Sequence, residues 1–400
     1  MISVADATDI VLSNALSLGT EKVPLAESLG RILAEPLNAD RDFPPFNRVT
    51  MDGISIQFSS FEKGIRTFPI QSTAPAGEAQ QTLNNPEHCI ESMTGAVLPE
   101  GCDTVIRYED LTIENGTATI NLDILKWGQN VHKQGEDRQQ GSQIVGPGKM
   151  ISPAEIGVAA TIGKHEVNVM KTPSVLIIST GDELVNVDET PAPHQIRSSN
   201  VHTIRAACAP YGLKIDEVHL LDNYETIRDK IANYLNEYQV LILSGGVSKG
   251  KFDYVPNALA ELKAEKLFHR VAQRPGKPFW FGTAPSGTVV FALPGNPVSS
   301  FMCFNRYFIP WLRKSLGLAA QEKPLARLDK PIFFKPDLTY LAQVKLSVDP
   351  TGQMCALPVE GNGSGDLANL TDADAFMEIP RGKENFEAGE LYPVIRYRPF

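Results

Sequence analysis

The sequence predicts a multidomain protein that combines α/β and β structure. We expect a central, mostly parallel α/β sheet domain with helices on both faces, a small β-rich domain, a helical linking domain and a C-terminal β-barrel-like domain. The chain has 400 residues, more than one hydrophobic core usually supports, so several domains are expected. Between residues 173 and 318, strand-like apolar runs alternate with helical patterns, which is typical of βαβ units. The flanking regions contain short strand patterns instead.

The N-terminal segment is expected to be helical and to belong to a discontinuous linking domain formed by residues 1–45 and 141–170. Apolar residues recur at helical spacing near the start, and the pattern is repeated in the next segment up to Pro36. Ser152 is placed to cap a further helix, with Pro153 in its first turn. The residues of the first apolar stripe are Val4, Ala7, Val11 and Ala15.

A small β-rich domain is expected at residues 46–140. The segment RDFPPFNRVTMDG at 41–53 is rich in Pro and Gly and marks the change to different structure. Further along, LTIENGTATI places Asn115 and Gly116 between two alternating segments. An Asn-Gly pair in this position is the strongest short-range signal of a β-hairpin.

The central α/β domain is expected at residues 171–322. One helix follows Ser199 or Asn200 as its cap, another follows Asn223, and the segment EVHLL between them is a predicted strand. The apolar stripes of the two helices are Val201, Ile204 and Cys208 in the first and Ile227, Ile231, Leu235 and Tyr238 in the second. Alternation of this kind favours a parallel sheet covered on both faces.

The last domain, residues 323–400, returns to β patterning. LAQVKLSV alternates before a turn at Asp349, and AFMEIP and YPVIRY follow. A small barrel or sandwich is therefore expected.

Composition excludes several classes of protein. The net charge of −10 and the pI near 5.3 argue against binding of duplex nucleic acid, which usually requires a basic face. The N-terminus lacks the pattern of a signal peptide, and no apolar run approaches the ~20 residues of a membrane span. The 5 cysteines are scattered without a CxxC pair, so neither a zinc site nor a disulfide framework is indicated. We expect a soluble, cytoplasmic protein with reduced thiols and no membrane partner.

Three short apolar runs each end in a loop of small residues. They are VLIISTGDEL at 175–184, QVLILSGGVSKG at 239–250 and TVVFALPGNPVSS at 288–300. Loops at the carboxyl ends of parallel strands meet in one crevice, where glycine lets backbone N–H groups approach an anion. Glu183 lies in the first loop, and Asp253 follows directly after the second. A carboxylate beside a phosphate normally implies Mg²⁺. The pattern predicts a site for a phosphorylated ligand.

The third loop adds a helix start. Asn296 is placed to cap this helix and Pro297 to occupy its first turn, so its N–H groups would form an anion site. The alternative is simply a well-capped helix after a tight turn. Pro310, later in the same apolar segment, is expected to kink or end the helix.

Basic residues lie beside these loops in VAQRPGKPFWFG at 271–282. Arg274 and Lys277, preceded by Arg270, suit capture of a phosphate or another oxyanion, although a solvated basic turn is the alternative. The sequence contains no Walker A, GxGxxG or HExxH motif. Chemistry would therefore depend on carboxylates, a metal ion and backbone donors.

The order of the motifs resembles that of molybdopterin molybdenumtransferases, and the resemblance covers nearly the whole chain. The motifs are PPFNRVTMDG, MTGAVLPEGCDTVI, GED at 135–137, STGDEL, SGGVSKGKFDY, RPGKP and LPGNPVS. This family, which is related to the C-terminal part of gephyrin and to its plant counterpart, inserts molybdate into adenylylated molybdopterin and releases AMP. The resemblance implies that this chain completes molybdenum cofactor synthesis, with Mg²⁺ as cofactor and molybdate and adenylylated molybdopterin as substrates.

The resemblance also implies a homodimer of four-domain subunits whose active cleft is shared. One subunit would supply the catalytic residues Asp52, Thr94 and Asp137, and the other Glu183, Asp222 and Asp253. Glu183 and Asp253 would hold the metal ion, and the RPGKP loop would attract molybdate. The residues implied in binding the cofactor are Thr180, Gly181, Asp182, Ser244, Gly245, Gly246, Ser248, Arg270, Arg274, Lys277, Pro294, Gly295, Asn296 and Pro297. A molybdopterin adenylyltransferase is a candidate partner.

Some positions depart from the pattern of the family. The usual FDNSAMDG is FNRVTMDG here, with Asn47 and Val49 in place of an acid and a serine. Arg270 and Arg274 stand where lysine is frequent, which keeps the charge but changes the hydrogen-bond geometry. The last domain carries Leu341, Gln343 and Lys345 in a strand where the family often has arginine.

Two other functions are compatible with the motifs. One is a molybdopterin adenylyltransferase, because a domain with the same GG and PGNP loops performs that reaction, although the additional domains argue against it. The other is a non-catalytic cofactor-binding or scaffold protein, against which the retained carboxylates argue. Release of AMP that depends on molybdate would separate these functions from that of the transferase.

Overall fold

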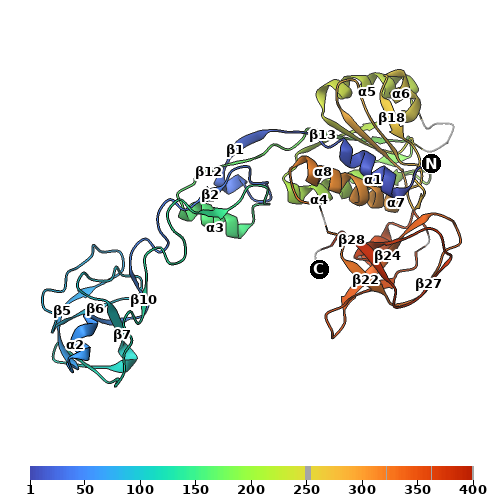
Figure 1. Ribbon diagram of the computed structural model, residues 1–400. Helices are drawn as coiled ribbons and strands as arrows, with labels where there is room; N and C mark the ends of the chain where they lie inside the picture. Colours follow the sequence, from blue (N-terminus) through green and yellow to red (C-terminus); the bar gives the residue numbers. More distant parts are fainter. Residues whose placement is uncertain (248–253, 321, 362, 399–400) are drawn as a thin grey trace. The chain divides into compact units, whose positions relative to one another are not determined.

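The computed structural model describes residues 1–247, 254–320, 322–361 and 363–398, and the chain forms two compact units (Figure 1). The first unit consists of Met1–Ala34, Gly148–Ser152 and Asn168–Phe400. The second consists of Glu35–Pro147 and Pro153–Val167. No helix in the described ranges is both long enough and apolar enough to cross a membrane.

A six-stranded sheet forms the centre of the first unit. In sheet order, its strands are β16 (Ile215–Leu220), β13 (Val175–Thr180), β17 (Val240–Ser244), β21 (Val289–Leu293), β20 (Trp280–Thr283) and β18 (Glu265–Phe268). The first four strands are parallel, whereas β20 is antiparallel to both of its neighbours, β21 and β18. Strands β13, β17 and β21 are buried throughout, which explains their continuous apolar runs. The expectation of a mostly parallel α/β sheet is confirmed.

Helices cover both faces of this sheet (Figure 1). Alternate residues of β13 pack into different clusters: Val175 and Ile177 lie in one hydrophobic core, and Leu176 and Ile178 lie in the other. The helices of the first core are α1 (Val4–Ser13), α4 (Asn200–Cys208), α7 (Pro297–Cys303) and α8 (Ile309–Ser315). Those of the second are α5 (Tyr224–Glu237) and α6 (Val255–Glu261). The predicted cap of α5 is confirmed, since Asn223 Oδ1 accepts a bond from Thr226 N, 2.9 Å away, whereas Ser199 precedes α4 without a capping bond from its side chain.

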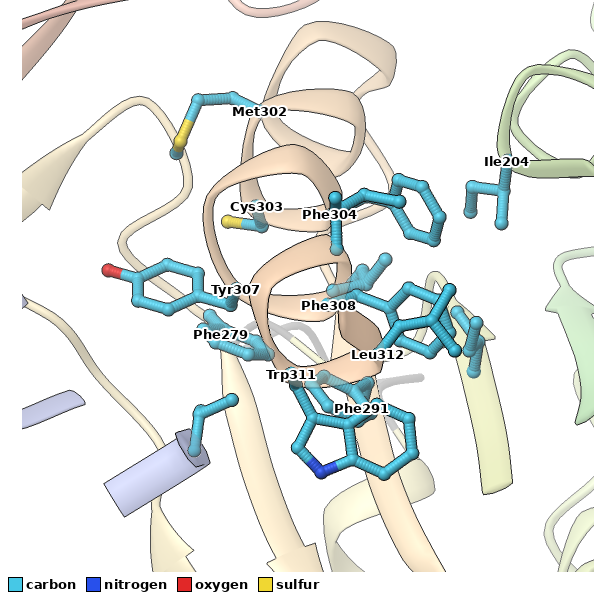
Figure 2. Close-up of a cluster of buried hydrophobic side chains, with 14 of the residues drawn as sticks. Ile204, Phe279, Phe291, Met302, Cys303, Phe304, Tyr307, Phe308, Trp311 and Leu312 are labelled. Atoms are coloured by element: carbon cyan, nitrogen blue, oxygen red, sulfur yellow. The ribbon is translucent and has the colours of Figure 1, made fainter. Parts of the chain in front are cut away.

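Helices α7 and α8 form one continuous helical segment joined by a π-helical turn, Phe304–Phe308. The helix continues past Pro310 to Ser315, so Pro310 does not end it. A proline in a helix removes one backbone donor, and a wider turn beside it is a known way to accommodate the change. Figure 2 shows the aromatic side chains around this helix, where the ring centroids of Phe291 and Trp311 lie 5.3 Å apart.

The C-terminal region of the first unit contains a closed five-stranded barrel. Its strands, in order around the barrel, are β24 (Thr339–Val348), β25 (Met354–Pro358), β22 (Leu325–Leu328), β28 (Leu391–Arg396) and β26 (Ala375–Ile379), and β26 pairs again with β24. Alternate residues such as Ala342, Val344 and Leu346 fill the interior. The expectation of a barrel-like domain is confirmed.

Short elements complete the first unit. Strand β19 (Gln273–Arg274) pairs with the start of β24, so the RPGKP loop begins beside the first residues of this barrel strand. The other pairs in this unit are β14 (Leu184–Val185) with β15 (Ile196–Arg197) and β23 (Ile332–Phe333) with β27 (Asn385–Phe386). Strand β1 (Thr20–Pro24) pairs with β12 (Glu166–Met170), of which Asn168–Met170 belong to this unit. The 3-10 turns are Leu25–Glu27, Ala209–Tyr211 and Ala368–Thr371.

The prediction of a helix in the segment that ends at Pro36 is wrong. This segment is extended at β1, makes one 3-10 turn and then forms bridges from Ile32 to Met150 and from Leu33 to Val169. Gly30 has a φ of +77°, and a side chain there would meet the carbonyl oxygen of Pro210 at 2.6 Å. The apolar positions therefore alternate in a strand ladder rather than on a helix face.

The second unit contains another six-stranded sheet. In order, its strands are β7 (Thr104–Arg107), β4 (Gly53–Ile56), β6 (Cys89–Ser92), β5 (Thr67–Ala74), β9 (Thr117–Ile120) and β8 (Leu111–Glu114). The hairpin predicted at Asn115-Gly116 joins β8 to β9, with φ values of +47° and +74° at these two residues. The helices are α2 (Phe58–Glu62) and the predicted α3 (Pro153–Thr161), and Tyr108–Asp110 form a 3-10 turn.

Two short ladders extend the second unit beyond its sheet. They pair β3 (Arg48–Val49) with β10 (Val131–His132), and β2 (Leu37–Asn38) with β11 (Gln143–Val145). The first ladder brings the TMDG motif and the GED motif to the same part of this unit.

Candidate functional site

The three glycine loops meet at the carboxyl ends of β13, β17 and β21. They surround a pocket of about 480 Å³ in the first unit, which we call the loop pocket. The loops approach each other backbone to backbone: a methyl group on Gly295 would lie 3.6 Å from the Cα of Gly245. Gly245 has a φ of +103°, and a side chain there would meet the carbonyl oxygen of Thr180 at 3.0 Å. Only glycine permits this close approach.

Most of the residues predicted for the phosphorylated ligand line the loop pocket. These residues are Thr180, Gly181, Glu183, Asp222, Ser244, Gly245, Gly246, Pro294, Gly295, Asn296 and Pro297. Ser248 and Asp253, which belong to the same prediction, lie outside the described residues. The convergence of the three loops is therefore a property of the fold, and the polar groups of the loops face one space.

One polar side chain of the loop pocket lacks a partner. The hydroxyl of Thr180 is buried and makes no hydrogen bond to any residue in the described ranges. Thr180 ends β13, so this hydroxyl lies at the mouth of the sheet. A buried hydroxyl without a partner is unfavourable by roughly 1–3 kcal/mol, and a polar ligand in the pocket would supply the missing bond.

Asn200 holds two of the loops together. Its Nδ2 donates to Ser244 Oγ and to the carbonyl oxygen of Gly295, both at 2.8 Å. Asn200 starts α4, and the preceding residues Arg197, Ser198 and Ser199 also line the pocket. The sequence pattern predicts this segment only as a helix start. The local sign of its second role is the run of four polar residues, Arg197 to Asn200.

The acidic residues of the loop pocket have separate roles. Glu183 and Asp222 line the pocket, whereas Asp182 Oδ1 accepts a bond from the backbone N of Asp222 at 3.0 Å. Carboxylate oxygens are suitable Mg²⁺ ligands, and one or two of them together with ligand phosphates form a usual Mg²⁺ site. Within the described ranges, no three His, Cys, Asp or Glu side chains are grouped to hold a metal. The two carboxylates thus fit a metal shared with a phosphate.

A second pocket of about 950 Å³, the cationic pocket, adjoins the first. Arg274 and Lys277 line it, and it shares Pro278, Pro294 and Asn296 with the loop pocket. Strand β24 of the barrel forms another wall. Arg270, which was predicted with Arg274, lines neither pocket of the described chain.

The start of α7 is partly closed by the barrel. The backbone N of Val298 donates to the carbonyl oxygen of Ser364 at 3.1 Å, and Asn296 Nδ2 donates to Ser364 Oγ at 2.8 Å. Asn296 makes no capping bond with its side chain. The expectation of free N–H groups at this helix start is therefore wrong for Val298, because a loop distant in sequence already occupies it.

Gln343 brings a further unpaired group to the cationic pocket. Its Oε1 is buried and has no hydrogen-bond partner among the described residues. Burial raises the pKa of the neighbouring Tyr340, and the charge of Arg274 acts in the opposite direction. This pocket therefore combines exposed cations with a polar wall from the barrel.

The remaining predicted residues lie in the second unit. Asp52 Oδ1 accepts a bond from the backbone N of Thr94 at 2.6 Å. The backbone and side-chain bonds from Thr94 hold the pKa of Asp52 below its ordinary value. This carboxylate is therefore ionised and fixed in orientation.

Asp137 is held by a histidine. His132 Nε2 lies 3.1 Å from Asp137 Oδ1, and Arg48 Nη2 lies 3.1 Å from His132 Nδ1. Arginine can only donate, so neutral His132 accepts at Nδ1 and donates from Nε2 to Asp137. The side chain of Asp137 is 55% exposed, so the carboxylate remains open to a ligand.

Family models match nearly the whole chain. Residues 2–163 match the MoeA N-terminal region (domain I and II), residues 176–314 a probable molybdopterin binding domain, and residues 325–397 the MoeA C-terminal region (domain IV). A molybdopterin molybdenumtransferase of Synechocystis sp. is 39% identical over 99% of this chain and 100% of its own length. One from Staphylococcus epidermidis is 32% identical over 98% of this chain and 95% of its own length. The crystal structure of a molybdopterin biosynthesis MoeA protein from Pyrococcus horikoshii covers 100% of both chains with a TM-score of 0.83 and 30% identity.

Proposed function

Because the chain belongs to the MoeA family of molybdopterin molybdenumtransferases, we propose that it inserts molybdate into adenylylated molybdopterin and releases AMP. The observation that carries this proposal is the shared wall between the loop pocket and the cationic pocket, formed by Pro278, Pro294 and Asn296. One pocket suits a phosphorylated organic ligand, and the other suits an oxyanion. A transferase that joins two such substrates needs both sites side by side.

The loop pocket would hold the phosphoanhydride of adenylylated molybdopterin. The glycine loops allow the backbone to approach the phosphates, and the unpaired hydroxyl of Thr180 can donate to an oxygen. Glu183 and Asp222 would repel the phosphates on their own, and they would instead hold Mg²⁺ together with them. The metal ion would neutralise charge on the leaving AMP. Asp253 is proposed as a further ligand on the strength of the family motif.

The cationic pocket would collect molybdate. Arg274 and Lys277 line this pocket and attract a dianion. Molybdate held here lies next to the dithiolene end of a ligand anchored in the loop pocket. Insertion of the metal then becomes effectively intramolecular, which removes much of the entropic cost of bringing two substrates together.

Asp52, Thr94 and Asp137 would complete the site from the second unit of a partner subunit. The orientation of Asp52 by Thr94 and of Asp137 by His132 supports a role for these carboxylates in ligand contact. We accordingly propose a homodimer with a shared cleft, acting in the cytoplasm with a molybdopterin adenylyltransferase as candidate partner. In such a dimer, each active site needs residues from both chains.

The direct test is a reconstitution. The purified protein is mixed with adenylylated molybdopterin and Mg²⁺, and AMP release and cofactor formation are measured with and without molybdate. We expect release to depend on molybdate and to be abolished by Asp137→Ala or Asp222→Ala, while the exposed controls Asp123→Ala and Asp188→Ala retain it. Binding without release would favour a carrier, and adenylylation of molybdopterin would favour an adenylyltransferase.

Mixing variants tests the shared cleft. If each site combines two chains, random co-assembly of Asp137→Ala with Asp222→Ala leaves one intact site in half of the dimers, and about a quarter of the wild-type activity returns. If each site belongs to one chain, every site carries a defect and no activity returns. The second result would reject the shared cleft without affecting the proposed reaction.

A further inference from the structure

A third pocket lies away from the two already described. It has a volume of about 460 Å³ and is enclosed by α1, by the helical segment that ends in α8 and by β28 of the barrel. It shares no lining residue with the loop pocket or the cationic pocket. Its walls are largely apolar and include Leu12, Pro310, Leu318, Val394 and Ile395. A volume of this size suits a small organic molecule.

A buried arginine lies at this pocket, on the π-helical turn. Arg306 is only 4% exposed and forms an ion pair with Glu378, with Nε at 3.1 Å from Oε2 and Nη2 at 3.4 Å from Oε1. The Nε atom is close to that carboxylate, but its N–H bond has no acceptor with suitable geometry among the described residues. The guanidinium therefore retains hydrogen-bonding capacity in a place that water hardly reaches.

A lysine competes for the same carboxylate. Lys323 Nζ lies 3.0 Å from Glu378 Oε2, so two cations share one acid. Burial, and then repulsion by Arg306, lower the pKa of Lys323. Burial alone would raise the pKa of Glu378, but Arg306 and Lys323 hold it below its ordinary value. The carboxylate is thus ionised, and one positive charge is left without a partner.

The rest of the lining increases this imbalance. Lys314 and Arg396 also line the pocket, whereas Glu322 is the one carboxylate among the described lining residues. The side chain of Lys323 is 36% exposed, and Lys314 and Arg396 are also exposed, so these cations form a solvated rim around an apolar interior. An anionic ligand would bring a counter-charge to this rim and an acceptor to the buried Arg306, and an apolar body on the ligand would match the walls.

We propose that this pocket binds a small organic monoanion, a carboxylate or sulfonate with an apolar body. The anionic group would accept hydrogen bonds from Arg306 and Lys323, and the body would pack against Leu12 and Ile395. The site is independent of the proposed transferase reaction, because it uses none of the residues assigned to that reaction.

The proposal is tested with a pair of fluorescent probes on the intact chain. Anilinonaphthalene sulfonate carries the anionic group, and N-phenyl-naphthylamine has the same apolar body without it. We expect saturable binding of one sulfonate probe per chain, about tenfold tighter than binding of the neutral probe, which is the effect of one charge-assisted hydrogen bond. Neither AMP nor molybdate should displace the probe.

Variants locate the probe. Lys323→Met should weaken binding of the sulfonate about tenfold and leave the neutral probe unaffected, whereas Lys330→Met, the same exchange at an exposed position outside the pocket, should change neither. Leu12→Trp should fill the pocket and reduce binding of both probes. Equal affinity for the two probes, equal effects of the two lysine variants, or displacement by AMP or molybdate would each overturn the proposal.

Discussion

Replacing Asn200 with alanine tests whether the loop pocket depends on a link between two of its loops. The Asn200 amide makes two hydrogen bonds of 2.8 Å, to Ser244 Oγ and to the carbonyl oxygen of Gly295. A hydrogen bond contributes about 0.5–1.5 kcal/mol net. Gly295 is exposed, so water can replace part of the loss there. We therefore expect the free energy of unfolding to fall by about 1–2 kcal/mol.

The effect on activity should be of similar size. If the link holds the loops in the arrangement needed in the transition state, a loss of about 1.4 kcal/mol lowers kcat/KM about tenfold. The assays are denaturant unfolding and molybdate-dependent AMP release. Asn200→Asp keeps the size but removes the donors, so it should be at least as defective. Asn236→Ala, which removes an amide bonded to Ala232 O on the exposed end of α5, is the control. Full activity of Asn200→Ala, or equal losses in Asn200→Ala and the control, would refute the reasoning.

Three further expectations concern the core, one carboxylate and the thiols. Phe291→Ala should lower the free energy of unfolding by about 3–5 kcal/mol in denaturant titrations, because the ring is fully buried among Phe281, Phe308 and Trp311; the exposed Phe333→Ala should change it by less than about 0.5 kcal/mol. Thr94→Ala should raise the pKa of Asp52 in a carbon NMR titration but leave it below its ordinary value, because the backbone bond remains. Since the folded pKa of Asp52 is depressed, its stabilisation is present above the unfolded pKa and is lost as the pH falls through the folded pKa; an unchanged titration in Thr94→Ala would contradict the assignment. Burial raises the pKa of Cys89, Cys102 and Cys208 to about 12, so iodoacetamide should label these thiols far more slowly in the native chain than in the unfolded chain, and equal rates would show that the thiols are accessible.

Local patterns predicted those parts of the fold that local physics decides. The continuous apolar run at 175–180 reflects burial of both sheet faces, and Asn115-Gly116 reflects two residues with positive φ. The segment before Pro36 was misread because its apolar residues pack in ladders with distant partners. Propensity and spacing contain no information about Met150 or Val169, so a tertiary contact decided the structure there.

The candidate site also combines features that the local sequence predicts with features that depend on distant contacts. The glycine loops were recognisable because glycine at a strand end has a physical cost that close backbone contact explains. By contrast, Ser364 closes the start of α7 across 68 residues of sequence, and Asn200 reaches Gly295 across 95. A polar side chain gives no local sign of the partner that it will find, so links of this kind were not predictable.

Charge is distributed so that the two adjoining pockets would not compete for one substrate. Among the described lining residues, the loop pocket has two acids, Glu183 and Asp222, and one cation, Arg197. The cationic pocket has two cations, Arg274 and Lys277, and one acid, Glu360. The balance of charge therefore favours a free oxyanion in the cationic pocket. Adenylylated molybdopterin differs from free molybdate because contacts with its organic parts add binding energy. These contacts would offset the repulsion between its phosphates and the two carboxylates until a metal ion neutralises the carboxylates. The wall of Pro278, Pro294 and Asn296 thus separates two electrostatic environments within one unit. Under the proposed function, this separation assigns each substrate to its own pocket before the reaction and requires only a short transfer across the shared wall.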